Sequence, residues 1–189
     1  MNQPTEPVMD LPGNVTELET LLSCPPETLL ESCSDWQGDL IVLGVGGKMG
    51  PTLARMAQRA LRTTGSRHRV IGVSRFHDTR ARQCLEDWGI QTIACDLLNE
   101  TEVGKLPQAP NVIAMPGFKF GVGKHPEQAW AANCYLPSLI CRHVRASRIV
   151  AFSTGNFNGM VPHDSGGTVE TDNPRPSGEY AMTELGRER

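Results

Sequence analysis

Residues 40–50 read LIVLGVGGKMG, an unbroken apolar run followed by a turn with four glycines. Such a run predicts a parallel strand that is buried on both faces. A helix is expected from about residue 51 to 63, and Pro51 suits its first turn because that position needs no N–H donor. The free N–H groups of a helix N-terminus attract anions, so this order of strand, glycines and helix predicts a phosphate site.

The glycines fit the spacing G-x-x-G-x-x-G through Gly44, Gly47 and Gly50. The first permits a tight turn, the second lets the backbone approach a pyrophosphate, and the third lets the helix pack close to the strand. Lys48 and Met49 lie inside the loop and are further candidates for binding the ligand. The loop is not of the nucleoside-triphosphatase type, because no Ser or Thr follows Lys48. A glycine-rich turn without a ligand is the alternative.

Alternating strands and helices continue along the chain. Strands are expected at 69–75, 90–97, 111–116 and 148–154, and helices at 79–89, 126–147, with a bend at Pro137, and 178–189. This order predicts an α/β fold, a doubly wound parallel sheet of about five strands in three layers.

A separate N-terminal segment precedes this domain. Residues 1–13 read as a loose leader, and residues 14–33 predict two short helices because Pro25-Pro26 interrupts the run. We therefore expect a helical extension over 1–38 and a nucleotide-binding domain over 39–189.

The composition favours a globular protein. The chain has 189 residues, 39% of them hydrophobic, and a net charge of -3 from 18 basic and 21 acidic residues. No basic block suggests nucleic-acid binding, and no apolar run approaches the roughly 20 residues of a membrane span. The polar start lacks the features of a signal peptide, so a cytoplasmic location is predicted. The six cysteines contain no C-x-x-C pair, which predicts buried, reduced thiols and no metal site.

The second strand ends in Ser74-Arg75 rather than in a carboxylate. An Asp or Glu there normally binds the adenosine ribose of NAD. A hydroxyl and a guanidinium suit a 2′-phosphate better, with Lys48, Arg80 and Arg82 as further charges, so NADP is favoured over NAD. The alternative is that Arg75 is a solvated surface residue.

From residue 39 onward the chain resembles the extended short-chain dehydrogenase/reductase superfamily, and within it the NAD-dependent epimerase/dehydratase family. The resemblance rests on the glycine motif, on Cys95-Asp96-Leu97 after the third strand, and on the segment NVIAMPGFKFG after the fourth. It also rests on Asn133 in the following helix and on RIVAFSTGNFNG, in which Thr154 precedes Tyr180 by 26 residues.

The resemblance implies a Rossmann-like fold and a role for each matched residue. Asp96 would bind the adenine amino group and Leu97 would pack against the ring. The segment containing Met115, Pro116 and Gly117 would line the cofactor, and Lys119 would lie near the nicotinamide ribose. Thr154 would hold the substrate oxygen, Tyr180 would transfer its proton, and Asn133 would support them.

Two features depart from the family. The lysine expected four residues after Tyr180 is Glu184, and an anion there would oppose deprotonation of the tyrosine. Arg187 lies on the same helix face and is the nearest substitute in charge. The chain also ends inside the tyrosine helix, so we expect it to be truncated, without the family's C-terminal substrate domain.

Two functions follow from this pattern. The first is an NAD(P)-dependent oxidoreductase or epimerase/dehydratase-like enzyme, acting on a hydroxyl- or carbonyl-bearing metabolite such as a sugar nucleotide. The second is a non-catalytic NAD(P)-binding module or redox-sensing regulator, which the loss of the lysine favours. A small-molecule substrate is the expected partner, and a homodimer remains open.

Overall fold

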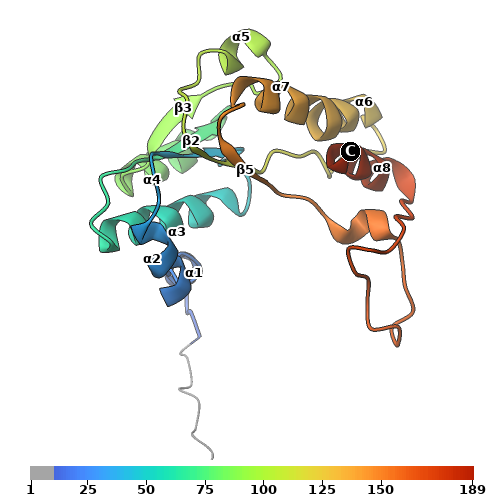
Figure 1. The fold of residues 1–189 in the computed structure, drawn as a ribbon, viewed down its shortest axis with the longest axis horizontal. Coiled ribbons are helices and arrows are strands. Elements are labelled where there is room, and N and C mark those ends of the chain that lie inside the picture. Colours follow the sequence, from blue (N-terminus) through green and yellow to red (C-terminus); the bar gives the residue numbers. More distant parts are fainter. Residues whose placement is uncertain (1–10) are drawn as a thin grey trace, which may run out of the picture.

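The computed structural model describes residues 11–189 and contains a five-stranded parallel sheet with helices on both faces (Figure 1). The strands lie in the order β3-β2-β1-β4-β5. Their bounds are β1 (Leu40–Leu43), β2 (Val70–Ser74), β3 (Gln91–Ala94), β4 (Asn111–Ala114) and β5 (Arg148–Ala151). The predicted doubly wound sheet of about five strands is thereby confirmed. Part of the predicted leader, residues 1–10, lies outside the described residues.

Side chains of the central strand alternate between two apolar cores, as the pleat of a strand requires. Ile41 and Leu43 belong to a core that also contains residues of β2, β3 and the helices on one face. Leu40 and Val42 belong to a core on the opposite face. Because both faces of β1 are buried, its sequence is an unbroken apolar run rather than an alternating one.

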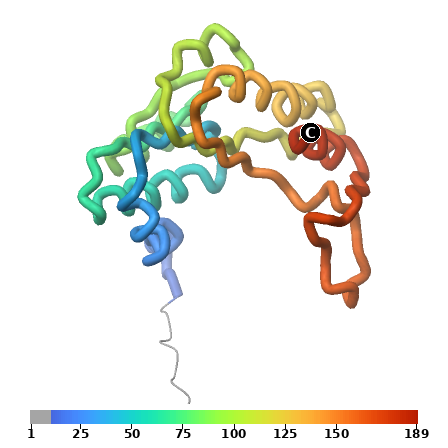
Figure 2. Tube along the Cα trace, viewed as in Figure 1, coloured from blue at the N-terminus to red at the C-terminus, as the bar shows by residue number. Residues whose placement is uncertain are grey.

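Two groups of helices supply these cores. The first core is covered by α5 (Glu100–Val103) and α7 (Leu136–His143), and the second by α3 (Gly50–Thr63) and α4 (Thr79–Asp87). Figure 2 shows the two groups on opposite sides of the sheet.

The N-terminal extension forms two short helices, α1 (Val15–Leu22) and α2 (Glu27–Ser34), as the two prolines predict. Both pack on α3, where the Arg59 guanidinium donates to the carbonyl of Thr20 (2.9 Å) and the hydroxyl of Ser23 (3.1 Å).

The predicted helix over 126–147 differs from expectation. It consists of α6 (Pro126–Trp130), a π-helical turn over Ala131–Tyr135, and α7, which ends at His143. Pro137 has no N–H to donate to the carbonyl of Asn133, four residues earlier, so regular α-helical bonding is broken there. The irregularity is therefore a widened turn before the proline, and the helix ends four residues earlier than predicted.

The sheet is not covered evenly. Helices α3 and α4 lie over β1, β2 and β3, and the side chain of Val150 on the edge strand β5 is 61% exposed. The last helix, α8 (Gly178–Glu188), packs beside α6 and the π-helical turn after a long loop from residue 159 (Figure 1). Tyr180 is thus positioned by helix–helix contacts.

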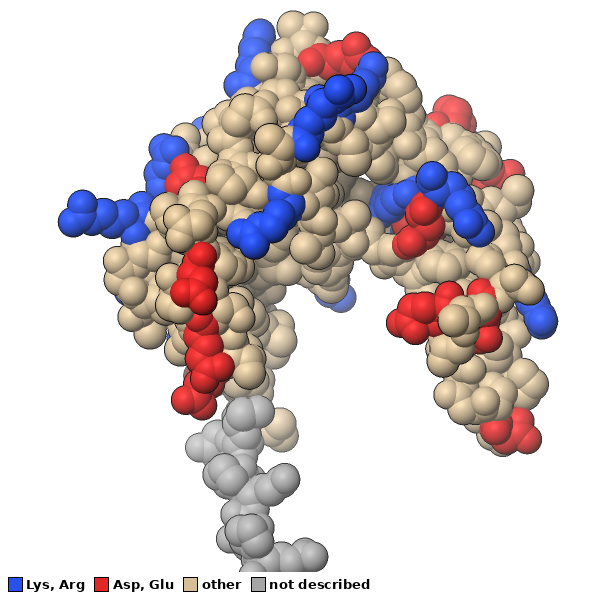
Figure 3. Space-filling view, viewed as in Figure 1, with Lys and Arg blue, Asp and Glu red and all other residues tan. Residues whose placement is uncertain are grey.

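The described residues bear on the expectations about membranes, metal ions and charge. None of the helices between residues 11 and 189 is both long and apolar enough to cross a membrane. In the same range, no three His, Cys, Asp or Glu side chains gather where they could hold a metal ion. Lys and Arg are dispersed among acidic residues on the face drawn in Figure 3.

Replacing Leu61 by alanine should test the packing of α3 on the sheet. Leu61 is 1% exposed, and truncating such a side chain costs about 2–5 kcal/mol of unfolding free energy. Leu22→Ala, at a position that is 52% exposed in α1, is the matched control and should change stability by less than about 0.5 kcal/mol. Urea unfolding followed by circular dichroism measures both; equal losses would contradict this packing.

Candidate functional site

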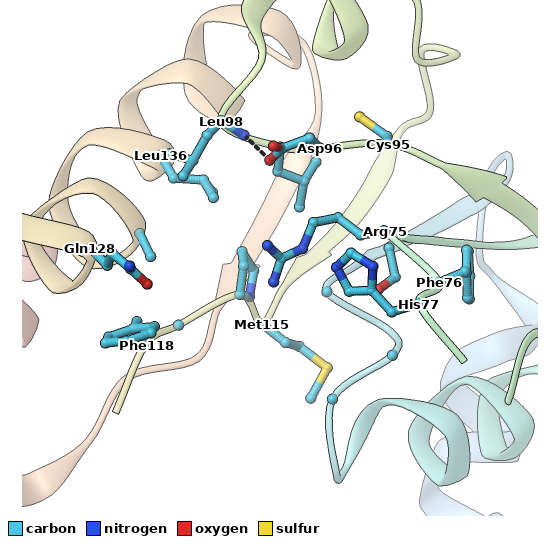
Figure 4. Close-up of a pocket in the computed structure, with 18 of the residues that line it drawn as sticks. Arg75, Phe76, His77, Cys95, Asp96, Leu98, Met115, Phe118, Gln128 and Leu136 are labelled. Carbon is cyan, nitrogen blue, oxygen red and sulfur yellow. Dashed lines mark hydrogen bonds between the residues drawn. The ribbon is translucent and has the colours of Figure 1, made fainter. Parts of the chain in front are cut away.

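A cavity of about 830 Å³ opens at the edge of the sheet where the strands end. Four of the strands contribute to it, with Gly44 following β1, Ser74 ending β2, Asp96 following β3 and Met115 following β4. The carboxyl edge of a parallel sheet is where ligands bind in open α/β folds. Figure 4 shows the side chains of these segments around the hollow.

The glycines of the first loop are required by close contacts. Gly44 has a φ of 80°, and a Cβ on it would lie 2.8 Å from the nitrogen of Pro116. A Cβ on Gly50 would lie 2.2 Å from the carbonyl oxygen of Val45. Only glycine therefore lets the first loop touch the loop after β4 and lets α3 begin beside β1.

Nine of the predicted cofactor residues line this cavity, and four do not. The nine are Gly44, Gly47, Ser74, Arg75, Asp96, Leu97, Met115, Pro116 and Gly117. Lys48, Met49, Gly50 and Lys119 lie outside its lining, as do the predicted catalytic residues Asn133, Thr154 and Tyr180.

The segment after β2 forms one end of the cavity. Arg75 extends its guanidinium across the hollow, with His77 beside it (Figure 4). Between them Phe76 adopts a φ of 48°, a left-handed conformation that non-glycine residues rarely occupy. Phe76 and both of its neighbours line the same cavity.

The additional charges expected near Arg75 are placed elsewhere. Arg82 pairs with Glu86 at 3.0 Å and lies over the ring of Phe76, so its charge is already partnered. Lys48 and Arg80 do not line the cavity. Arg75 is therefore the cationic side chain at this end, with the nearby Asp78 accepting the N–H of Arg80 as the cap of α4.

The segment after β3 adds a carboxylate and a buried thiol. Asp96 accepts the backbone N–H of Leu98 at 3.1 Å, which fixes the carboxylate at the rim (Figure 4). Burial raises the pKa of the Cys95 thiol to about 11, and the nearby Glu102 and Asp96 carboxylates add to the shift. Cys33 is also buried, whereas Cys24 and Cys141 are exposed, so the prediction of buried thiols is wrong for those two.

The opposite wall was not predicted from the sequence. It comes from α6, the π-helical turn and α7, whose lining residues are Glu127, Gln128, Ala131, Ala132 and Leu136. The adjacent small residues Ala131 and Ala132 were the available signal, because small side chains on a helix leave room for a ligand.

Asn133 joins three segments rather than facing the cavity. Its side chain is fully buried, accepts the N–H of Phe118 (2.8 Å) and donates to the carbonyl of the same residue (3.0 Å). It also donates to the hydroxyl of Thr183 on α8 (2.9 Å). The π-helical turn thus carries an amide that fixes the loop after β4.

Tyr180 and Thr154 lie on separate elements beyond the cavity lining. The ammonium of Lys119 lies 5.3 Å from the centre of the Tyr180 ring, a cation–π distance. The hydroxyl of Thr154 accepts the N–H of Asn156 at 3.3 Å. Thr154 thereby caps a short 3₁₀ turn, Gly155–Asn158. The cation beside Tyr180 is therefore a lysine from the loop after β4.

Glu184, at the position of the family's lysine, is buried within α8 and is 2% exposed. Its carboxylate lies 3.2 Å from the Arg187 guanidinium. Burial raises the pKa of Glu184, and this effect outweighs the opposing influence of Arg187. From the sequence, Arg187 is expected as the nearest substitute for the lysine; in the structure it pairs with Glu184 instead.

The Cys95 thiol should resist alkylation. With its pKa near 11, about one thiol in a thousand is ionised at pH 8, and the side chain is 3% exposed. Iodoacetamide should label the exposed Cys24 and Cys141 first, as measured by peptide mass spectrometry over time. Labelling of Cys95 at the rate of Cys24 would contradict the placement of this wall.

Comparison with known proteins identifies similar folds. No known family profile and no curated protein sequence matches the chain. UDP-glucuronic acid 4-epimerase from Bacillus cereus, solved with NAD, superimposes with a TM-score of 0.63 at 23% identity over 79% of this chain. ADP-L-glycero-D-manno-heptose-6-epimerase from Helicobacter pylori gives 0.66 at 15% identity over 86%. A short-chain dehydrogenase/reductase superfamily protein from Agrobacterium tumefaciens, with bound NAD, gives 0.58 at 17% identity over 79%.

The chain spans about half the length of these proteins: 50% of the first, 51% of the second and 42% of the third. The chain has the Rossmann-like fold of the epimerases and of the short-chain dehydrogenase/reductase superfamily, as the sequence motifs predicted.

Proposed function

We propose that this chain binds a nicotinamide dinucleotide along the carboxyl edge of its sheet. The observation that carries the proposal is one cavity lined by Gly44 and Gly47, by Arg75 at one end and by the Met115–Phe118 loop at the other. The first turn of α3 offers free N–H groups to a pyrophosphate. Two of the similar structures were solved with NAD, which supports the same ligand class.

The layout of the cavity orients the dinucleotide. The ends of β2 and β3 would hold the adenosine half, because this is where Rossmann-like folds bind the ribose. The glycine loop after β1 would hold the pyrophosphate. The loop after β4 and the wall of α6 would then receive the nicotinamide half, which supplies hydride transfer when bound.

Arg75 supports NADP over NAD as the preferred cofactor. Its guanidinium lies in the cavity at the ribose end, and the strand-end position next to it is Ser74 rather than a carboxylate. A guanidinium forms bidentate bonds with a phosphate, whereas an NAD site normally uses an Asp or Glu there.

Substituting Arg75 by aspartate should reverse the cofactor preference. We expect the wild type to bind NADPH about tenfold more tightly than NADH, which corresponds to about 1.4 kcal/mol, and R75D to bind NADH more tightly than NADPH because a carboxylate repels the 2′-phosphate. Fluorescence titration measures both affinities. Arg145→Asp, which introduces the same charge change at an exposed position outside the cavity, is the control. Tighter binding of NADH by the wild type would contradict the role of Arg75.

The cofactor site supports an oxidoreductase or epimerase/dehydratase-like enzyme acting on a hydroxyl- or carbonyl-bearing substrate. Thr154 would hold the substrate oxygen and Tyr180 would exchange its proton, with Lys119 as the nearby cation. Since one similar structure contains UDP-glucuronic acid and another UDP-glucose, a sugar nucleotide is the first substrate class to test.

The Tyr180 role can be tested by substitution. The chain, incubated with NADP or NAD and UDP-sugars, should change absorbance at the nicotinamide wavelength or convert the sugar, as followed by chromatography. Tyr180→Phe should slow turnover by about 10²–10⁴-fold without weakening cofactor binding. Cofactor binding without turnover in the full-length protein would instead favour the second candidate, a non-catalytic binding module or redox-sensing regulator. The buried Glu184–Arg187 pair at the position of the usual lysine is the observation that favours that candidate.

A further inference from the structure

Arg187 is the most completely bonded charged side chain on α8. Its Nη1 donates to the carbonyl of Phe152 (2.8 Å) and faces the Glu184 carboxylate (3.2 Å). Its Nη2 donates to the carbonyl of Pro116 (2.9 Å) and to Oδ1 of Asn133 (3.2 Å), and its Nε donates to the Asn133 carbonyl (3.2 Å). Nε, Nη1 and Nη2 therefore each donate to at least one backbone or amide oxygen, and Nη1 also pairs with a carboxylate.

These acceptors belong to three separate segments. Pro116 lies in the loop that lines the cavity after β4, Phe152 follows β5, and Asn133 is in the π-helical turn. The guanidinium is the point at which these segments meet α8. The side chain is only 9% exposed, so its bonds compete little with water.

One of these hydrogen bonds satisfies a carbonyl that Pro137 leaves without its helical donor. Pro137 cannot donate an N–H to the Asn133 carbonyl, and the Nε of Arg187 donates to that oxygen instead. The side chain of Asn133 in turn binds both backbone groups of Phe118. Arg187 therefore supports the loop after β4 twice, directly at Pro116 and through Asn133 at Phe118.

Gly117, in the same loop, lies near both Arg187 and Asn133. A Cβ added to Gly117 would lie 3.4 Å from Nη2 of Arg187 and 3.6 Å from Oδ1 of Asn133. Gly117 thus faces these two side chains with room for ordinary contact, and it also lines the cavity.

We propose that Arg187 is a positioning residue that fixes the Pro116–Phe118 loop at the nicotinamide end of the cavity. It acts through backbone carbonyls and Asn133 and does not itself line the cavity. Glu184 has the complementary role of holding the guanidinium in place. This inference rests on the proposed function, because it assigns the two ends of the cavity to the two halves of the dinucleotide.

A comparison of two ligands separates positioning from stability. NADPH spans both ends of the cavity, whereas adenosine 2′,5′-bisphosphate reaches only the adenosine end. Arg187→Lys keeps a cation opposite Glu184 but offers three N–H groups without the planar fork. We expect it to weaken NADPH about tenfold, equivalent to the loss of one or two hydrogen bonds, and to change the bisphosphate affinity by less than about twofold.

Two further variants complete the experiment. Arg69→Lys makes the same replacement in an exposed pair with Asp39 and should leave both affinities unchanged. The double variant Glu184→Gln with Arg187→Gln removes both buried charges together, so neither is left unpaired. It should give the same selective loss of NADPH affinity. Hydrogen exchange of peptides covering residues 115–120 should accelerate in both Arg187 variants, while peptides of β1 and β2 keep their protection.

The outcomes distinguish a positioning role of Arg187 from a role in stability alone. Selective loss of NADPH affinity with faster exchange in the loop supports the inference. Equal loss of both ligands, no loss in a folded variant, or failure of both Arg187 variants to fold would overturn it, since Arg187 would then serve stability alone. A wild-type chain that binds neither ligand would overturn the proposed function itself.

Discussion

The position of β1 between β2 and β4 determines where a ligand can bind in this molecule. Strand β1 pairs with β2 on one side and with β4 on the other. The loops after β1 and β2 lead to α3 and α4 on one face, whereas the loop after β3 leads to α5 and the helices that follow β4 include α7, both on the other face. The neighbouring loops after β1 and β4 therefore diverge, and a crevice opens between them. Gly44 allows the two central loops to touch at the base of that crevice, since any Cβ there would collide with Pro116.

Much of the fold and half of the site could be predicted from local sequence. The central strands β1 and β2 are buried on both faces, so they read as apolar runs, and the glycine spacing places a turn between β1 and α3. Ser74-Arg75 and Asp96 were identifiable because they follow strands whose ends share one edge. Local sequence did not indicate which distant residues the polar side chains bond to. Arg187 and Pro116 are 71 residues apart, and nothing in the spacing indicates that they bond.

The structure shows which charged residues surround Tyr180 and Glu184, at the position where the family has a lysine. In the sequence, Glu184 is an anion one turn after Tyr180, and Arg187 is the nearest substitute for the lysine's charge. In the structure it is buried against Arg187, and the cation near the Tyr180 ring is Lys119 from the loop after β4. The loop after β4 therefore connects the cavity lining, the buried pair and the tyrosine. The carbonyls of Pro116 and Phe118 in this loop accept hydrogen bonds from Arg187 and Asn133.

A crystal structure of the chain grown with NADPH would locate the nucleotide in the cavity. We expect density for the pyrophosphate at the first turn of α3, the 2′-phosphate at Arg75, and the nicotinamide against Met115–Phe118, with the Arg187 bonds to Pro116 and Asn133 preserved. Density for the nucleotide elsewhere, or in the reverse orientation with its adenosine at the loop after β4, would contradict the assignment of the site.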